Sequence, residues 1–331
     1  MKLCYLLFAP YSKNRGKYTL TDFKKVKNAP YFFDIDIDTS SISKTEVNLD
    51  GVKVSIEYFL YDQKVLLAQC VYDLNEKLTE STIFVKEKVN NMLREKLLES
   101  LNYKGNLVEE YSVILMQDAA NPSEFVKKKK YLLARLMRNL DNKIDASEVE
   151  DILYSKVSYT KGDLTIVDWE GAIIFAKDGD FESDIELLKV GNYQLLRYRM
   201  LDSEIEDNLI LLRNKLENKK KSIIPRGNAI LRQTVDTQLS LLLDFDKVDQ
   251  SLLLVGDWYS SKLYKLIVSE FYLNDWKTIV KDRLESLSSI DETMRGNLTF
   301  SWERFLDIVS IVGWAVLLVG YFWLYFKDAG F

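Results

Sequence analysis

Residues 308–326, IVSIVGWAVLLVGYFWLYF, form an apolar segment that constrains the fold more than any other feature of the chain. The segment has no charged residue, and Ser310 is its one clearly polar side chain. At about 1.5 Å per residue, a helix of this length matches the hydrocarbon core of a bilayer. A buried helix of a soluble domain is the alternative, but such helices are usually shorter and polar on one face. The sequence therefore predicts one transmembrane helix over residues 305–327.

Aromatic residues gather at the C-terminal end of the predicted span. Tyr321, Trp323 and Tyr325 are expected to form a belt at the interface between membrane and water, where aromatic rings are enriched. Lys327 follows them and marks the return to water, so that residues 328–331 are expected to be a short tail.

Small residues recur along one stripe of the span. Ser310, Gly313, Leu317 and Gly320 follow one another at helical spacing. Because small residues let helices approach closely in lipid, the stripe favours a homo-oligomer. The alternative is that the glycines are merely tolerated against lipid.

The N-terminal sequence MKLCYLLFAP contains a short apolar run that could be taken for a signal peptide. The run is at the lower length limit of such a peptide and lacks a small-residue cleavage site, so a first β-strand explains it better. Without an export signal, the N-terminal domain is expected on the cytoplasmic side of a single-pass, tail-anchored membrane protein.

The composition excludes several classes of chemistry. The chain has no histidine, which removes catalysis by Ser-His-Asp or Cys-His groups and every zinc site that needs histidine. Its two cysteines, Cys4 and Cys70, lie in apolar runs and are expected to be buried thiols. A net charge of −5 gives no electrostatic case for a nucleic-acid partner. No cofactor is predicted.

Residues 1–180 are predicted to form a mixed α/β domain of the α+β or α/β class. Val52, Val54 and Ile56 alternate with polar residues, as in a half-buried strand. The predicted strands are residues 51–60, 64–73, 111–116, 163–169 and 172–177, and the predicted helices are residues 81–101 and 121–140.

Residues 181–304 are predicted to be helical. Leu201, Ile205 and Leu209 begin a helical stripe that continues to residue 216, and further stripes occupy residues 231–242 and the chain from about residue 252 onward. These segments are expected to pack as an antiparallel bundle or coiled-coil stalk whose last helix runs into the membrane without a break.

Asp34, Asp36 and Asp38 alternate in the sequence YFFDIDIDT. On a strand they would share one face and could hold a divalent cation such as Mg²⁺ or Ca²⁺. An exposed acidic strand face is the alternative, with the intervening apolar residues turned inward. The cluster has neither a nucleophile nor a base beside it, and the sequence has no glycine-rich phosphate loop, so no enzymatic activity is predicted.

A family resemblance rests on residues 164–202, LTIVDWEGAIIFAKDGDFESDIELLKVGNYQLLRYRMLD. The order of strand, Asp168-Trp169, apolar strand, acidic turn and helix resembles a motif of uncharacterised bacterial membrane proteins. The layout of α/β domain, long helices and terminal apolar helix is similar to the YagE-type family, which is related to meiotic nuclear division proteins, and to the cytosolic funnel and stalk of CorA-type magnesium transporters. CorA proteins have two membrane helices joined by a Gly-Met-Asn loop. Here Met294-Arg295-Gly296-Asn297 precedes a single span, so no ion-selecting residue carries over.

The resemblance implies a membrane-anchored, oligomeric, non-enzymatic protein. The residues favour the same function, namely a structural or scaffold protein whose partners are the lipid bilayer and further copies of the chain. The alternative is a subunit of a CorA-like ion channel or transporter in which several spans line a pore. A metal-dependent enzyme built on the three aspartates is a third hypothesis.

Overall fold

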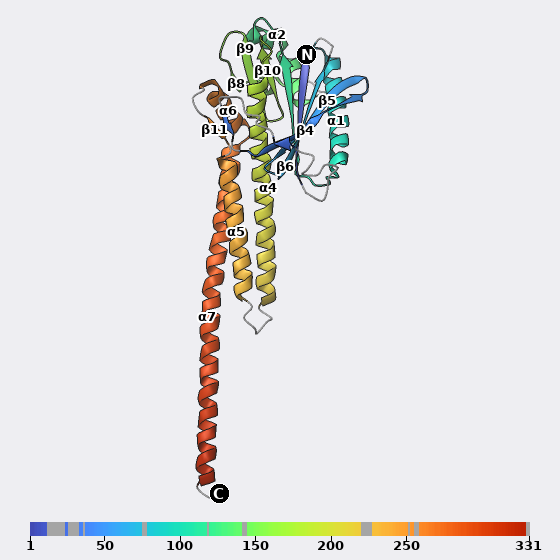
Figure 1. Cartoon of the computed structure of the whole chain (residues 1–331). Coiled ribbons are helices and arrows are strands. Elements are labelled where there is room, and N and C mark those ends of the chain that lie inside the picture. The colour runs from blue at the N-terminus through green and yellow to red at the C-terminus, as the bar shows by residue number, and fades with distance from the viewer. Residues whose placement is uncertain are drawn as a thin grey trace. The chain divides into compact units, whose positions relative to one another are not determined.

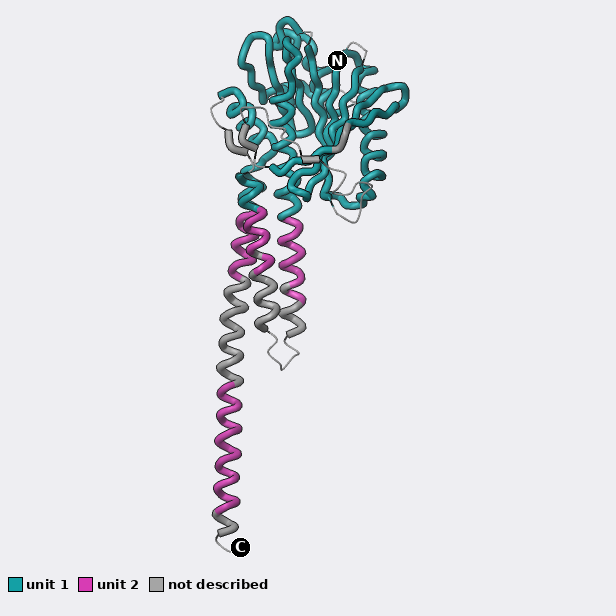
Figure 2. Tube along the Cα trace, viewed as in Figure 1, with its two compact units in different colours: residues 1–201, 245–279 teal, residues 202–244, 280–331 magenta. Residues whose placement is uncertain are grey.

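The computed structural model describes residues 1–11, 24–25, 33–35, 37–74, 78–117, 119–140, 144–219, 227–250, 252–254 and 258–328. The chain divides into two compact units (Figure 2). Unit 1 contains Met1–Leu201 and Phe245–Ile279, and unit 2 contains Asp202–Asp244 and Val280–Phe331.

A mixed β-sheet forms the framework of unit 1 (Figure 1). Among the described residues it has nine strands in the order β2-β4-β5-β6-β1-β7-β10-β9-β8. Neighbouring strands are antiparallel except β7 and β10, which are parallel. β3 (Phe33–Ile35) and β11 (Leu252–Leu254) form a separate antiparallel pair. The strands of the large sheet are β1 (Lys2–Pro10), β2 (Lys24–Lys25), β4 (Thr39–Leu49), β5 (Val52–Tyr61), β6 (Val65–Asp73), β7 (Glu109–Met116), β8 (Lys156–Val157), β9 (Asp163–Val167) and β10 (Gly171–Ala176).

β1 is a central strand, paired with β6 on one side and with β7 on the other. Residues 3–9 of β1 are all buried, as expected for a strand whose sheet is covered on both faces. The prediction that the N-terminal apolar run is a strand is confirmed. The predicted strands 51–60 and 64–73 are also confirmed, as β5 and β6, which pair with each other in antiparallel orientation.

Cys4 and Cys70 lie on neighbouring strands but face opposite sides of the sheet. Cys4 is opposite Val71, whereas Cys70 is opposite Tyr5, and successive side chains of a strand point to opposite faces. Both thiols are free and buried, and burial raises the pKa of Cys4 to about 12. The prediction of two buried thiols is confirmed.

One face of the sheet is covered by α1 (Glu80–Leu101), α2 (Pro122–Arg138) and α3 (Ala146–Ile152). Their apolar side chains join those of the strands in a single hydrophobic cluster. α2 begins as its sequence predicts, because Asn121 Oδ1 accepts a hydrogen bond from the backbone N–H of Glu124 at 3.3 Å and a proline occupies the first turn.

The opposite face is covered by the first part of α4 (Glu182–Lys219). Residues 187–198 of this helix are all buried, because the sheet lies on one side of it and α6 (Trp258–Glu270) on the other. A Cβ atom added at Gly191 would lie 2.4 Å from Cγ2 of Ile267, so only glycine permits this approach of α4 to α6. The helix begins at the predicted acidic turn, where Glu182 N–H donates to Asp180 Oδ1 at 3.2 Å.

Unit 2 is helical throughout its described residues and is formed by parts of α4, of α5 (Gly227–Asp249) and of α7 (Leu273–Asp328). Each of these helices contributes buried side chains, which include Ile205, Leu241 and Leu287. Arg283 of α7 pairs with two carboxylates of α4, Asp202 at 2.9 Å and Glu206 at 3.4 Å.

The predicted helical region differs from the structure in two respects. The helix predicted from about residue 252 is wrong at its start, because residues 252–254 form β11 and a turn separates α6 from α7. α5 buries Leu241, whereas Leu239 and Leu242 of the predicted stripe are exposed. Because Leu241 and Leu242 are adjacent in sequence, their side chains lie on different faces of α5, and only the face of Leu241 is packed against other residues. α7 itself is continuous, which confirms that the helix before the apolar segment runs into it.

Candidate functional site

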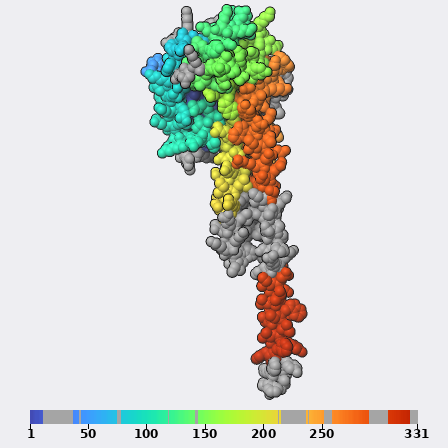
Figure 3. Space-filling model, turned by 180° about the vertical axis from the view of Figure 1, so that it is seen from behind, coloured from blue at the N-terminus to red at the C-terminus, as the bar shows by residue number. Residues whose placement is uncertain are grey.

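The C-terminal part of α7 carries the largest exposed apolar surface among the described residues. Leu306–Leu324 has a mean hydropathy of 1.9, and none of it is buried (Figure 3). By length and composition this segment can cross a membrane. Burial of a single Leu or Phe side chain is worth about 1.5–3 kcal/mol, so water is a poor solvent for such a surface. The chain therefore has one candidate membrane-spanning helix in its described part.

The predicted stripe of small residues lies on this segment. Ser310, Gly313, Leu317 and Gly320 are all exposed, and nothing lies within 4 Å of a Cβ atom built at either glycine. A single chain does not contain the neighbouring helix that such a stripe would contact. Self-association through it stays a prediction.

The predicted aromatic belt lies at the end of the same segment. Tyr321 and Trp323 are exposed, and Tyr321 packs edge-on against Phe322 with ring centroids 6.4 Å apart. Tyr325 belongs to α7, but its side chain lies outside the described residues.

The three candidate metal ligands are only partly described. The backbone of Asp34 belongs to β3, but its side chain and the whole of Asp36 lie outside the described residues. Asp38 is exposed, and its backbone N–H donates to Asp62 Oδ1 at 3.0 Å. The described residues contain no group of three or more carboxylates or thiols placed to hold a metal ion. A cation site at residues 34–38 stays a prediction.

Asp168 lies at the centre of a cluster of charged side chains in unit 1, formed with Arg138 and Glu148. Arg138, at the end of α2, donates to both carboxylate oxygens of Asp168 at 2.9 and 2.7 Å and also pairs with Glu148 of α3. Tyr111 Oη donates to the backbone carbonyl of Asp168 at 3.0 Å. This bidentate ion pair, in which two guanidinium N–H groups bind the two carboxylate oxygens, connects α2 to the turn between β9 and β10 and so has a structural role.

Trp169, the next residue, contacts the turn between α6 and α7. Its ring lies 6.3 Å from that of Phe271 and 5.9 Å from that of Tyr272. Tyr272 has a φ of +50°, in the left-handed region that a bulky residue rarely adopts. Trp169 of the motif that carries the family resemblance therefore packs against the turn from which α7 starts.

Asp62 forms a second polar cluster, which the sequence did not indicate. Its carboxylate accepts hydrogen bonds from Tyr193 of α4, from Lys247 of α5 at 2.6 Å and from the backbone of Asp38. Asp62 and Gln63 have positive φ angles in the turn between β5 and β6. Because the partners lie 131 and 185 residues away in the sequence, no local pattern signals them.

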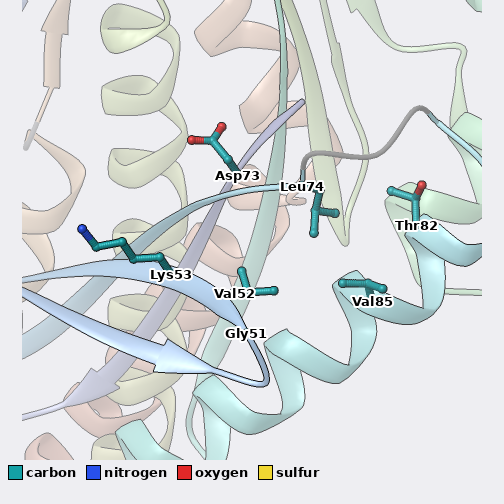
Figure 4. A pocket seen from close by; sticks show the side chains of 7 residues that line it. All are labelled: Gly51, Val52, Lys53, Asp73, Leu74, Thr82 and Val85. Carbon is teal, nitrogen blue, oxygen red and sulfur yellow. The ribbon is translucent and has the colours of Figure 1, made fainter.

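A pocket of about 490 Å³ lies between the β4–β5 turn, the end of β6 and α1. In Figure 4 the side chains of Val52, Leu74 and Val85 point towards one another, whereas those of Lys53 and Asp73 point away from these three. Lys53 already pairs with Glu46 at 2.7 Å. The hydroxyl oxygen of Thr82 in the lining accepts a hydrogen bond from the backbone N–H of Thr79 at 3.1 Å, as part of the cap of α1.

Comparison with known proteins places these features in a family. Residues 13–182, just over half of the chain, match a family model described as "Uncharacterized protein MJ0711, N-terminal domain". The uncharacterized protein MJ0711 of Methanocaldococcus jannaschii is 25% identical over 250 residues, which cover 75% of this chain and 73% of the relative. No solved structure matches the chain. Neither description mentions the YagE-type or CorA-type families, so those resemblances stay predictions.

Proposed function

The chain belongs to the family of the N-terminal domain of the uncharacterized protein MJ0711, and from this premise we propose that it is a membrane-anchored, oligomeric scaffold protein without enzymatic activity. In this proposal α7 holds the chain in the bilayer, and the folded remainder faces the cytoplasm.

One observation carries the proposal, namely the complete exposure of the apolar segment Leu306–Leu324. Unit 1, by contrast, buries its main apolar segments, since residues 3–9 of β1 and 187–198 of α4 are buried. Because unit 1 buries its core, the exposure of Leu306–Leu324 is best explained by a lipid environment for this segment.

Oligomerisation is supported by further uncovered apolar side chains in unit 2. Leu239, Leu242 and Leu243 of α5 and Ile210 and Leu211 of α4 are exposed. In the proposed assembly, α4, α5 and α7 form a helical stalk whose exposed leucines contact other copies, and the small-residue stripe does the same in lipid.

A non-enzymatic role is supported by the structural use of the polar groups in unit 1. The buried carboxylates of Asp62 and Asp168 are occupied by cations of the same chain at 2.6 and 2.7 Å. Such ion pairs fix helices to the sheet. The described pocket is lined by one carboxylate, that of the exposed Asp73.

Membrane anchoring is tested with arginines in the centre of the span. Each arginine there opposes insertion by about 2.5–3.5 kcal/mol, so the double variant Val316→Arg, Leu317→Arg is expected to leave the membrane fraction after an alkaline wash. The matched control is Ile210→Arg, Leu211→Arg, which adds the same charge to exposed apolar positions outside the span and is expected to stay membrane-bound. Equal retention of both variants would sink the anchoring proposal.

A further inference from the structure

Trp314 lies near the middle of the exposed apolar segment of α7, away from the ends of a span, where tryptophan is usually enriched. At about 1.5 Å per residue it is about 12 Å from Leu306 and about 15 Å from Leu324 along the helix axis. Its side chain is 69% exposed in the single chain. In the bilayer that this segment is proposed to cross, the indole N–H of Trp314 therefore lies in hydrocarbon.

The indole N–H of Trp314 has no hydrogen-bond partner within the part of the chain that the structure describes. An indole nitrogen can donate a hydrogen bond but cannot accept one, and hydrocarbon contains no acceptor. An unpaired polar group in hydrocarbon is unfavourable. The N–H of Trp314 therefore needs an acceptor from a helix that packs against this part of α7.

The side chains around this part of α7 divide into two faces. At about 100° per residue, one arc of about 140° carries Ser310, Gly313, Trp314, Leu317, Gly320, Tyr321, Leu324 and, at the N-terminal end, Asp307. We call this arc the polar face. The other arc carries only Ala, Val, Ile, Leu and Phe side chains between residues 308 and 322. This division is typical of a span that turns one face towards a neighbouring helix and the other towards lipid.

A suitable acceptor lies on the polar face itself, one helical turn from the donor. Ser310 precedes Trp314 by four residues, and its hydroxyl oxygen can accept a hydrogen bond. Copies that insert through the same C-terminal helix are parallel, so equal residues lie at equal depth. Because long side chains of a helix point towards its N-terminus, the indole of Trp314 reaches the depth of Ser310 on a neighbouring copy. The polar face is therefore complementary to itself.

We propose that in the membrane Trp314 of one copy donates its indole N–H to Ser310 Oγ of a second copy, and that this hydrogen bond selects the polar face as the contact between spans. Gly313 and Gly320 on the same face let the two helix axes come close enough for the bond. The inference rests on the proposed function, because it requires the span to lie in lipid and more than one copy to be present.

The test measures association of the full chain in phosphatidylcholine vesicles, by energy transfer between copies labelled at the N terminus with a donor or an acceptor dye. Trp314→Phe removes the N–H but keeps an aromatic ring, and it is expected to weaken association about threefold to tenfold. Ser310→Ala is expected to weaken association to a similar extent. The double variant is expected to lose no more than either single variant, because each substitution removes the same bond.

Trp323→Phe is the matched control, because it makes the same substitution outside the polar face, and it is expected to associate like the wild type. If the wild type shows energy transfer and Trp314→Phe shows as much, the hydrogen bond is overturned and the scaffold proposal stands. Additive losses for Trp314→Phe and Ser310→Ala would also overturn the bond, because the two side chains would then have different partners. A wild type without energy transfer would contradict the scaffold proposal itself.

Disulfide formation between copies tests the choice of face without any change at Trp314. Leu317→Cys lies on the polar face and Val312→Cys on the opposite face, while the native Cys4 and Cys70 are buried in unit 1. In vesicles treated with a mild oxidant, Leu317→Cys is expected to form a covalent dimer and Val312→Cys is expected to stay monomeric on a denaturing gel. Equal cross-linking of the two variants would overturn the assignment of the polar face.

Discussion

At the scale of single residues, Asp62 connects more of unit 1 than its place in a hairpin turn suggests. Its carboxylate joins the β5–β6 hairpin to Tyr193 of α4 and to Lys247 of α5. Asp62→Asn keeps the size of the side chain and its tolerance of positive φ but removes the charge. We expect the free energy of unfolding to fall by about 1–3 kcal/mol, which is the usual cost of losing hydrogen bonds to a charged group.

Chemical denaturation of the full chain in detergent measures this loss. Asp73→Asn is the matched control, because Asp73 is an exposed carboxylate at the end of β6. An Asp62→Asn variant as stable as the control would show that Lys247, whose side chain is 45% exposed, is as well solvated by water as by the carboxylate.

Charged residues with partners far away in the sequence are the part of unit 1 that could not be predicted from the sequence. The positions of β1, β5, β6 and α1 follow from local apolar patterns and were predicted. The buried positions of Lys86, Lys189 and Arg197 were not, because charged side chains on a helix are expected to face water. Lys189, for example, is buried between Glu186, Gln69 and the ring of Phe59, a surrounding that exists only after the sheet has formed.

At the scale of elements, the packing of α4 against α6 depends on the absence of a side chain at Gly191. Gly191→Ala would improve the helix propensity of α4 by about 1 kcal/mol. It would also place a methyl group 2.4 Å from Ile267 Cγ2 and 3.2 Å from the ring of Phe271. Overpacking costs about 1–3 kcal/mol, so we expect a net loss of stability.

A double-mutant cycle identifies the contact responsible. Ile267→Ala alone is expected to destabilise the protein by leaving a cavity, whereas the pair Gly191→Ala, Ile267→Ala is expected to lose less than the sum of the two single variants. Strict additivity would mean that Phe271 or the backbone, rather than Ile267, sets the distance between the helices.

The same element shows why burial could not be predicted along α4. An amphipathic stripe fits residues 201–216, but residues 187–198 are buried around the whole circumference of the helix. Their Asn192, Gln194 and Arg197 are polar, so the local pattern resembles a surface helix. Partners from distant parts of the chain make the difference, for example Tyr264, whose hydroxyl donates to Gln194 Oε1 at 2.6 Å.

At the scale of the whole molecule, the scaffold proposal requires more than one chain. We expect the full chain in mild detergent to have a protein mass of at least twice 38.6 kDa. Gly313→Ile, Gly320→Ile fills the small-residue stripe and is expected to weaken association about tenfold, since helix contacts in lipid are worth about 1–2 kcal/mol. Val312→Ile, Val319→Ile enlarges the two residues next to the glycines by one methylene each, outside the stripe, and is the control. A strictly monomeric wild type would contradict the proposal.

An oligomer alone does not separate a scaffold from a pore, but ion flux does. Among residues 308–324, which are exposed, Ser310 is the clearly polar side chain, so a pore lined by copies of this helix would offer an ion almost no replacement for its hydration shell. Transfer of an unsolvated ion into such a medium is prohibitively unfavourable. Full-length protein reconstituted in vesicles is therefore expected to pass Mg²⁺ and K⁺ no faster than empty vesicles do. If the wild type conducts ions and Ser310→Ala conducts fewer, the channel is favoured instead, because conduction would then depend on the clearly polar side chain of residues 308–324.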